Sequence, residues 1–182
     1  GVLRSYEQAL QRLALDTVDA LLIHDLDALI HGDPALVAAY ERQLIDDGGL
    51  AALQELKAAG DIRAYGMGLN TAEALMTTAQ KVDLDFALVA MPYTLLDQST
   101  LHTGMAGFVR RGVSVIIGAP FASGILVTGS QTGAKYAYGA APPEVQARVR
   151  GIEAVCAAHS VPLPAAALQF VLAHPAVVSV IP

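Results

Sequence analysis

The first candidate for a functional side chain is His24, a histidine at the end of a short apolar run. Residues 18–23 read VDALLI, and the chain turns polar at His24 and Asp25. An imidazole at the end of a buried strand can donate to a carbonyl oxygen and orient it, or act as a general acid. A histidine that only satisfies its neighbours at the strand end explains the pattern equally well. Both interpretations remain open on the residues alone.

An asparagine follows a second short run, residues 64–68. The Asn70 carboxamide offers both a donor and an acceptor, which suits a planar amide such as nicotinamide. Asn70 with Glu73, three residues later, is also typical of a helix N-cap. The pattern therefore predicts a helix cap as well as a cofactor contact, and the two roles can coexist.

A third candidate is the loop over residues 119–124, whose sequence is APFASG. Small residues let a backbone approach a phosphate or pyrophosphate closely. The loop has neither the G-x-G-x-x-G order after a first strand nor the G-x-x-x-x-G-K-[ST] order. Spacing alone therefore favours a flexible loop over a phosphate cradle.

Other reactive side chains support weaker hypotheses. Nitrogen and oxygen donors in an H-D-x-D-x3-H pattern could hold a divalent metal, and they are His24, Asp25, Asp27 and His31. Acidic residues are common in loops after strands, so we assign no metal site. Cys156 is predicted to be a small apolar residue of a helix rather than a nucleophile. Tyr136 and Tyr138 could close over a ligand or only pack.

Five short apolar runs predict the strands that position these residues, and they cover 18–23, 64–68, 86–91, 113–118 and 177–181. Helical spacing predicts helices over 5–15, 36–44, 50–59, 72–80 and 100–111, one opening at Pro142-Pro143 and another near Pro164. Ser5 and Gln8 predict a capping box at the first helix. The first strand lacks alternation, which predicts burial on both faces.

Strands that alternate with helices imply a parallel sheet with right-handed crossovers, in an open doubly wound sheet or part of a (β/α)8 barrel. Both architectures place their chemistry beyond the carboxyl ends of the strands. His24, Asn70 and the 119–124 loop each follow a predicted strand. We therefore expect them to converge on one face.

Composition excludes several classes of function. The 182 residues carry a net charge of −6 and are 54% hydrophobic, which suits a single domain and disfavours broad nucleic-acid binding. One cysteine cannot form an internal disulfide, so a reducing, cytoplasmic location is expected. No apolar run reaches the length of a membrane span. We predict one domain over 1–182, with no nucleic-acid or membrane partner.

Several longer motifs occur together and in order along nearly the whole chain. They are VDALLIHD at 18–25, GMGLN at 66–70, YTLLDQ at 93–98, GAPFASGIL at 118–126, AAALQF at 165–170, HP at 174–175 and VIP at 180–182. Together they resemble the aldo-keto reductase family, and most of all its D-threo-aldose 1-dehydrogenase branch, which includes L-fucose, D-arabinose and pyridoxal dehydrogenases.

The resemblance implies a (β/α)8 barrel, here represented by roughly its last five β/α units. It implies hydride transfer between NAD or NADP and an aldose or a related aldehyde or hemiacetal. By the same resemblance, His24 would orient the reacting oxygen and Asn70 would hold the nicotinamide carboxamide. Phe121, Ser123 and Gly124 would line the pyrophosphate or ribose.

The family's catalytic tyrosine, its partner lysine and a supporting aspartate lie on strands upstream of the region that matches Gly1. We therefore expect a domain incomplete at both ends and inactive as a fragment. The alternative is a non-catalytic nicotinamide-binding or regulatory barrel domain. A partial barrel would leave strand edges exposed, and pairing with a second copy of the chain would cover them. A homo-oligomer is therefore a further expectation. The expected partner is a small-molecule sugar or aldehyde.

Overall fold

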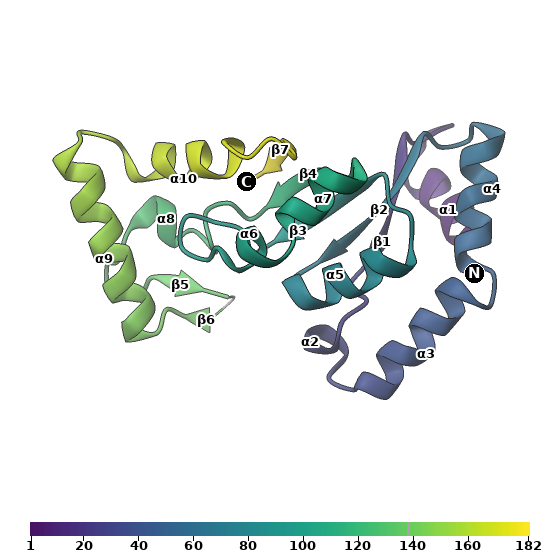
Figure 1. Ribbon diagram of the computed structural model, residues 1–182, viewed down its shortest axis with the longest axis horizontal. Helices are drawn as coiled ribbons and strands as arrows, with labels where there is room; N and C mark the ends of the chain where they lie inside the picture. Colours follow the sequence, from purple (N-terminus) through teal and green to yellow (C-terminus); the bar gives the residue numbers. More distant parts are fainter. Residues whose placement is uncertain (138) are drawn as a thin grey trace. The chain divides into compact units, whose positions relative to one another are not determined.

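The computed structural model describes residues 1–137 and 139–182, so Tyr138 lies outside the described residues. The chain forms two compact units, Gly1–Ala87 and Leu88–Pro182. Figure 1 shows both units with strands and helices following one another along the chain. The predicted alternation of strands and helices is therefore present in each.

Unit 1 contains two complete strands and five helices among its described residues. They are α1 (Val2–Leu13), β1 (Ala20–His24), α2 (Ala28–His31), α3 (Pro34–Ile45), α4 (Gly49–Ala59), β2 (Ala64–Leu69) and α5 (Ala72–Lys81). β1 pairs parallel with β2, and His24 stands opposite Gly68. Strand β3 (Phe86–Ala90) begins in this unit. Gly66 lies so close to β3 that a Cβ there would sit 2.5 Å from the Phe86 carbonyl oxygen.

Helix ends in unit 1 follow local chemistry. The Asp33 side chain accepts from the Ala35 N–H before a proline at the first helical position of α3. Gly60 ends α4 in the left-handed conformation, φ 82°, as its position after the apolar stripe predicts. The predicted capping box at Ser5 is wrong, because α1 begins at Val2 and Ser5 lies inside its first turns. The helical pattern extended further back than the capping signal indicated.

The prediction that the first strand is buried on both faces is wrong. Exposure alternates along β1: Leu21 and Ile23 are half-buried, whereas Ala20, Leu22 and His24 are exposed. Leu21, Leu22 and Ile23 line a cavity together with residues of α1, α3 and α4. Leu22 nevertheless remains 42% exposed, so the strand is not buried on both faces. An apolar run shows that a strand can be buried, but its neighbours decide whether it is.

Unit 2 continues the alternation. Its elements are the end of β3, α6 (Ser99–Thr103), α7 (Met105–Arg111), β4 (Ser114–Gly118), α8 (Ile125–Thr128), β5 (Lys135–Tyr136), β6 (Gly139–Ala140), α9 (Pro143–Ala158), α10 (Leu163–Leu172) and β7 (Val177–Ile181). β4 pairs parallel with β7, and β5 pairs antiparallel with β6. A buried core joins α8, α9 and α10 to the loop that follows β4, through Leu126, Val149, Ala167 and Ala122.

The helix predicted over 100–111 is two helices, α6 and α7. The break falls at Gly104, with φ −128° and ψ −39°, and glycine is among the weakest helix formers. Thr100, Met105 and Phe108 are all buried, so both pieces pack inward from different axes.

Among the described residues, no single helix is long and apolar enough to cross a membrane. Helices α9 and α10 pass that test only as a pair, with a bend of 97° between them.

Candidate functional site

Parallel pairing in unit 1 brings two of the predicted site residues to the same strand edge. The ladder between β1 and β2 continues one residue past His24, where the Asp25 N–H donates to the Gly68 carbonyl at 3.0 Å. Asn70 follows Gly68 by two residues. His24 and Asn70, which are 46 positions apart, therefore share one edge, as the sequence predicted.

Asp25 lies between His24 and Asn70 and contacts both. Its Oδ2 is 3.1 Å from His24 Nδ1. Its Oδ1 accepts a hydrogen bond from Asn70 Nδ2, also at 3.1 Å. One carboxylate thus uses both of its oxygens to connect the imidazole with the carboxamide.

Exposure differs sharply across this cluster of three residues. The His24 side chain is 75% exposed and that of Asp25 is 22% exposed. A polar contact this exposed adds only about 0–1 kcal/mol to stability, even where both partners are charged. Its effect is therefore on the orientation of the imidazole, whose exposed face is open to a ligand.

The prediction that Asn70 caps the following helix is wrong. The N-cap of α5 is Thr71, and no side-chain hydrogen bond caps it. The Asn70 amide instead faces Asp25 across the strand edge. A long-range carboxylate outcompetes the local backbone, because hydrogen bonds to charged groups are the stronger ones.

A second candidate site, within unit 2, is the loop after β4. Its backbone is left-handed at four positions, with φ between 47° and 92°, and they are Ala119, Ala122, Ser123 and Gly124. The Ala119 N–H donates to the Ile181 carbonyl at 3.0 Å, which ties the loop to the end of β7. Ala122 is 1% exposed and anchors the loop in the core.

This loop offers backbone donors rather than charged side chains. Ala122 and Gly124 donate within the loop, to the carbonyls of Ala119 and Phe121. Across residues 1–137 and 139–182, the N–H groups of Phe121 and Ser123 find no acceptor, and neither does the Ser123 hydroxyl. Phe121 is half-buried and packs against the core of unit 2. Unpaired N–H groups in a tight turn are the donors that bind phosphate oxygens.

The remaining candidate residues make contacts that stabilise the fold. Asp27 caps α2 by accepting from the Ile30 N–H at 3.1 Å. The His31 ring lies 5.0 Å from the Tyr40 ring. In the part of the chain that the structure describes, no three His, Cys, Asp or Glu residues are grouped so that they could hold a metal. Cys156 is buried.

Of the two tyrosines singled out after β4, Tyr136 is described. It is half-buried and packs against the core of unit 2. Burial raises its pKa, Asp97 raises it further, and Arg148 opposes the shift. Packing is therefore the interpretation that the structure favours for Tyr136.

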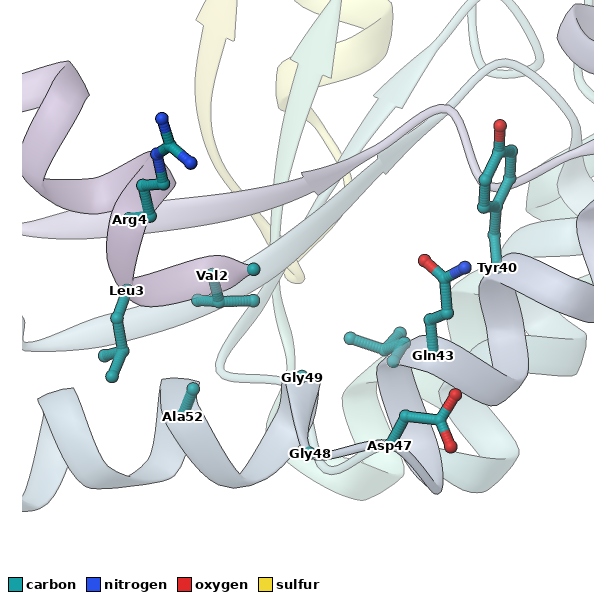
Figure 2. A pocket seen from close by; sticks show the side chains of 11 residues that line it. Val2, Leu3, Arg4, Tyr40, Gln43, Asp47, Gly48, Gly49 and Ala52 are labelled. Carbon is teal, nitrogen blue, oxygen red and sulfur yellow. The ribbon is translucent and has the colours of Figure 1, made fainter.

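Two cavities in unit 1 lie near different elements. One of about 680 Å³ opens between α1 and the ends of α3 and α4, and Figure 2 shows Arg4 and Asp47 at its border. None of His24, Asp25 and Asn70 lines it. A second, of about 340 Å³, is lined by Leu26 and Asp27, which follow Asp25, and by Thr71, which follows Asn70. The cavity beside the strand ends is thus the smaller of the two, near the lower limit of ligand pockets.

Comparison with known proteins agrees with this arrangement of strands and loops. The model of the aldo/keto reductase family matches residues 1–182, the whole chain. The chain belongs to the aldo/keto reductase family. The pyridoxal 4-dehydrogenase of Microbacterium luteolum is 36% identical over 181 residues, and the D-threo-aldose 1-dehydrogenase of a Pseudomonas species is 33% identical over 183. Each alignment covers 100% of this chain and 52% of the relative, so this aldo/keto reductase chain spans about half the length of the curated relatives it matches.

Solved structures identify the fold. The holo form of an aldo-keto reductase from Bacillus halodurans matches with a TM-score of 0.71 and 23% identity, over 98% of this chain and 55% of that one. A glycerol dehydrogenase from Gluconobacter oxydans matches with a TM-score of 0.63 and 18% identity, over 98% and 53%. The prediction of a (β/α)8 barrel of aldo-keto reductase type, represented in part, is confirmed.

Sequence reasoning considered Asp25 only as a metal ligand and missed its position between His24 and Asn70. The available signal was its place directly after His24 at the predicted strand end. Parallel register would have placed that carboxylate beside the end of β2. The left-handed backbone at Asp25, φ 52°, which turns the side chain toward Asn70, had no counterpart in the sequence pattern.

Proposed function

We propose that this chain is part of an NAD- or NADP-dependent oxidoreductase that acts on an aldose or a related aldehyde or hemiacetal. The observation that carries the proposal is the juxtaposition of His24 and Asn70 through Asp25, in a chain whose whole length matches the family. The relatives' names support the substrate class, since one acts on pyridoxal and the other on D-threo-aldoses.

Unit 1 is assigned the reacting groups. His24 presents an exposed imidazole that hydrogen-bonds the reacting oxygen of the substrate and sets its orientation. Asn70 uses its Nδ2 on Asp25, which leaves its carbonyl oxygen to accept from a nicotinamide carboxamide. When bound, the nicotinamide supplies or accepts the hydride.

Unit 2 is assigned the phosphate and ribose of the cofactor. Among the described residues, the N–H groups of Phe121 and Ser123 are unpaired, and they are the donors that an anionic pyrophosphate needs. Gly124 holds a left-handed backbone, φ 92°, that lets the chain turn tightly there. These residues fit the cofactor by donor chemistry, and they do not distinguish NAD from NADP.

The test measures binding and turnover separately. We expect the 182-residue chain to bind NAD or NADP in a calorimetric titration without oxidising L-fucose, D-arabinose or pyridoxal. No residue in it is assigned the role of the family's catalytic tyrosine. The full product of the same gene is expected to oxidise at least one of these substrates. Failure to bind either cofactor, together with no turnover by the full product, would contradict the proposal.

Two variants assign the roles within unit 1. Asn70→Ala should weaken cofactor binding about ten-fold through the lost amide contact. Because Thr71 rather than Asn70 is the N-cap of α5, lost capping does not confuse this result. His24→Ala should leave cofactor affinity within about two-fold of the parent. Binding by the chain, with no turnover by its full gene product, would support the alternative of a non-catalytic nicotinamide-binding domain.

A further inference from the structure

We propose that Asp25 is a positioning residue that holds His24 in its Nδ1–H tautomer and fixes the orientation of the Asn70 amide. The substrate contact of His24 would then be a bare Nε2 that accepts a hydrogen bond from a hydroxyl group. The substrate part rests on the proposed function, whereas the positioning part concerns contacts within unit 1 alone.

The tautomer follows from the charge of the carboxylate. His24 Nδ1 is 3.1 Å from Asp25 Oδ2, a close contact with a negatively charged oxygen. A proton on Nδ1 is attracted to that oxygen, whereas a lone pair there would be repelled, so the contact favours the imidazole proton on Nδ1. A neutral imidazole has only one such proton, so its other nitrogen is an acceptor.

The same reasoning orients Asn70. Its Nδ2 donates to Asp25 Oδ1 at 3.1 Å, so the amide oxygen points away from the carboxylate. Without Asp25, the two amide orientations would differ little in energy, because both ends of a carboxamide form hydrogen bonds with water. Asp25 thus sets which atom Asn70 offers to a ligand.

Asp25 is itself held by the backbone. Its N–H donates to the Gly68 carbonyl at 3.0 Å, and its φ is 52°. Aspartate and asparagine tolerate this left-handed region better than most residues. Its side chain is 22% exposed against 75% for His24, so the carboxylate is the more firmly placed partner.

An Nε2 atom without a proton distinguishes the alcohol or hemiacetal form of a substrate from its oxidised carbonyl or lactone form. A hemiacetal or alcohol has an O–H that can donate to it, whereas a carbonyl or lactone oxygen has no hydrogen to donate. Neutral His24 therefore favours the hydroxyl form. This agrees with a dehydrogenase acting on the C1 hydroxyl of an aldose.

Nitrogen NMR of the histidine rings in the ligand-free chain tests the positioning role. His24→Ala assigns the His24 signals among the five histidines. Above the titration range of imidazole, we expect His24 to be mainly the Nδ1–H tautomer. Asp25→Gly removes the carboxylate and relieves the left-handed backbone, and it should lower the ratio of Nδ1–H to Nε2–H about five-fold.

Two further variants separate charge from contact. Asp25→Asn keeps the shape and the tolerated backbone, but it replaces one of the two contacting oxygens with an NH2 group that donates. Either His24 or Asn70 then faces a donor, so either the His24 tautomer or the Asn70 amide signal must change. Asp16→Asn removes an exposed carboxylate elsewhere in unit 1 and should change neither signal. The Asn70 side-chain amide protons should exchange with water faster in Asp25→Gly.

An Nε2–H tautomer in the parent chain, or tautomer ratios equal in the parent and Asp25→Gly, would overturn the positioning role. Adding L-fucose to the full gene product tests the substrate part. We expect the His24 Nε2 signal to move in the parent and to stay unchanged in Asp25→Gly. Pyridoxine, which carries a hydroxymethyl group, is a second hydroxyl probe. If neither L-fucose nor pyridoxine moves the His24 Nε2 signal, the hydroxyl selection and the proposed function fail. The positioning role still stands in that case if the tautomer ratios change as expected.

Discussion

The candidate sites of the two units use different chemical groups. In unit 1, side chains carry the chemistry, and the carboxylate of Asp25 holds His24 and Asn70 in place. In unit 2, the backbone carries it, through left-handed residues and unpaired N–H groups in the loop that contains Ser123. Amino-acid substitutions in unit 1 should therefore act by removing side-chain contacts. Substitutions in the loop of unit 2 should act by changing the backbone conformation.

Replacing a glycine within a strand should produce the largest loss of stability. A Cβ at Gly66 in β2 would lie 2.5 Å from the Phe86 carbonyl oxygen, so Gly66→Ala forces backbone apart and should cost about 3 kcal/mol or more. At Gly118 in β4 the nearest atoms are side-chain carbons of Leu88 and Ala90, at 3.2 and 3.3 Å. Gly118→Ala crowds side chains rather than a backbone oxygen, and it should cost less, about 1–2 kcal/mol. Chemical denaturation measures both, and equal losses would contradict the argument.

Loss of the imidazole is the next effect in size. In the full gene product, His24→Ala should lower kcat about 100-fold, which corresponds to about 2.7 kcal/mol, because the reacting oxygen loses its orienting group. Steady-state kinetics with L-fucose measure the change. His159→Ala, at the exposed end of α9, is the control and should be neutral. A parent-like kcat in His24→Ala would remove the role assigned to His24.

The loop of unit 2 should respond to backbone preference rather than to side-chain chemistry. Ser123 has φ 60°, where a β-branched residue is strained, so Ser123→Val should lower the free energy of unfolding by about 1–2 kcal/mol. Ser123→Gly suits this backbone and should keep cofactor affinity within about two-fold of the parent. If Ser123→Gly instead loses affinity as Asn70→Ala does, the Ser123 hydroxyl rather than the backbone binds the cofactor.

Alkaline pH should produce the smallest effect, in unit 2. Burial raises the pKa of Tyr93 above 10.0, so the folded state favours its protonated form. This contribution to stability is complete below pH 10.0 and is lost as the pH rises from there through the raised pKa of the folded state. Tyr93→Phe should therefore reduce the fall in unfolding free energy between about pH 9 and about pH 11. An unchanged pH dependence would assign the loss to other groups.

Much of the fold was predictable from local pattern. Apolar runs located β1, β2, β3, β4 and β7 to within two residues of their observed ends, and residues 177–181 matched β7 fully. The two-residue strands β5 and β6 were not predicted. Gly60 was predicted to end α4 and does so. These features depend on neighbouring residues, so the sequence contains the information directly.

The errors fall where distant residues compete with local ones. Asn70 had a helix-cap signature, but the carboxylate of Asp25 binds it from another strand. Residues 18–23 predicted a strand buried on both faces, yet exposure alternates along β1. Both outcomes depend on what lies beside the residue in space, which periodicity does not encode.

The sequence by itself determined which residue types stand at the strand ends and that the chain resembles the aldo-keto reductases. Those properties reside in composition, order and short-range spacing. Only the tertiary structure decided that Asp25 joins His24 to Asn70, and that the N–H groups of Phe121 and Ser123 find no acceptor among the described residues. The physical reason is that hydrogen-bond partners are chosen by register and backbone angle, and both are set once the parallel strands have paired.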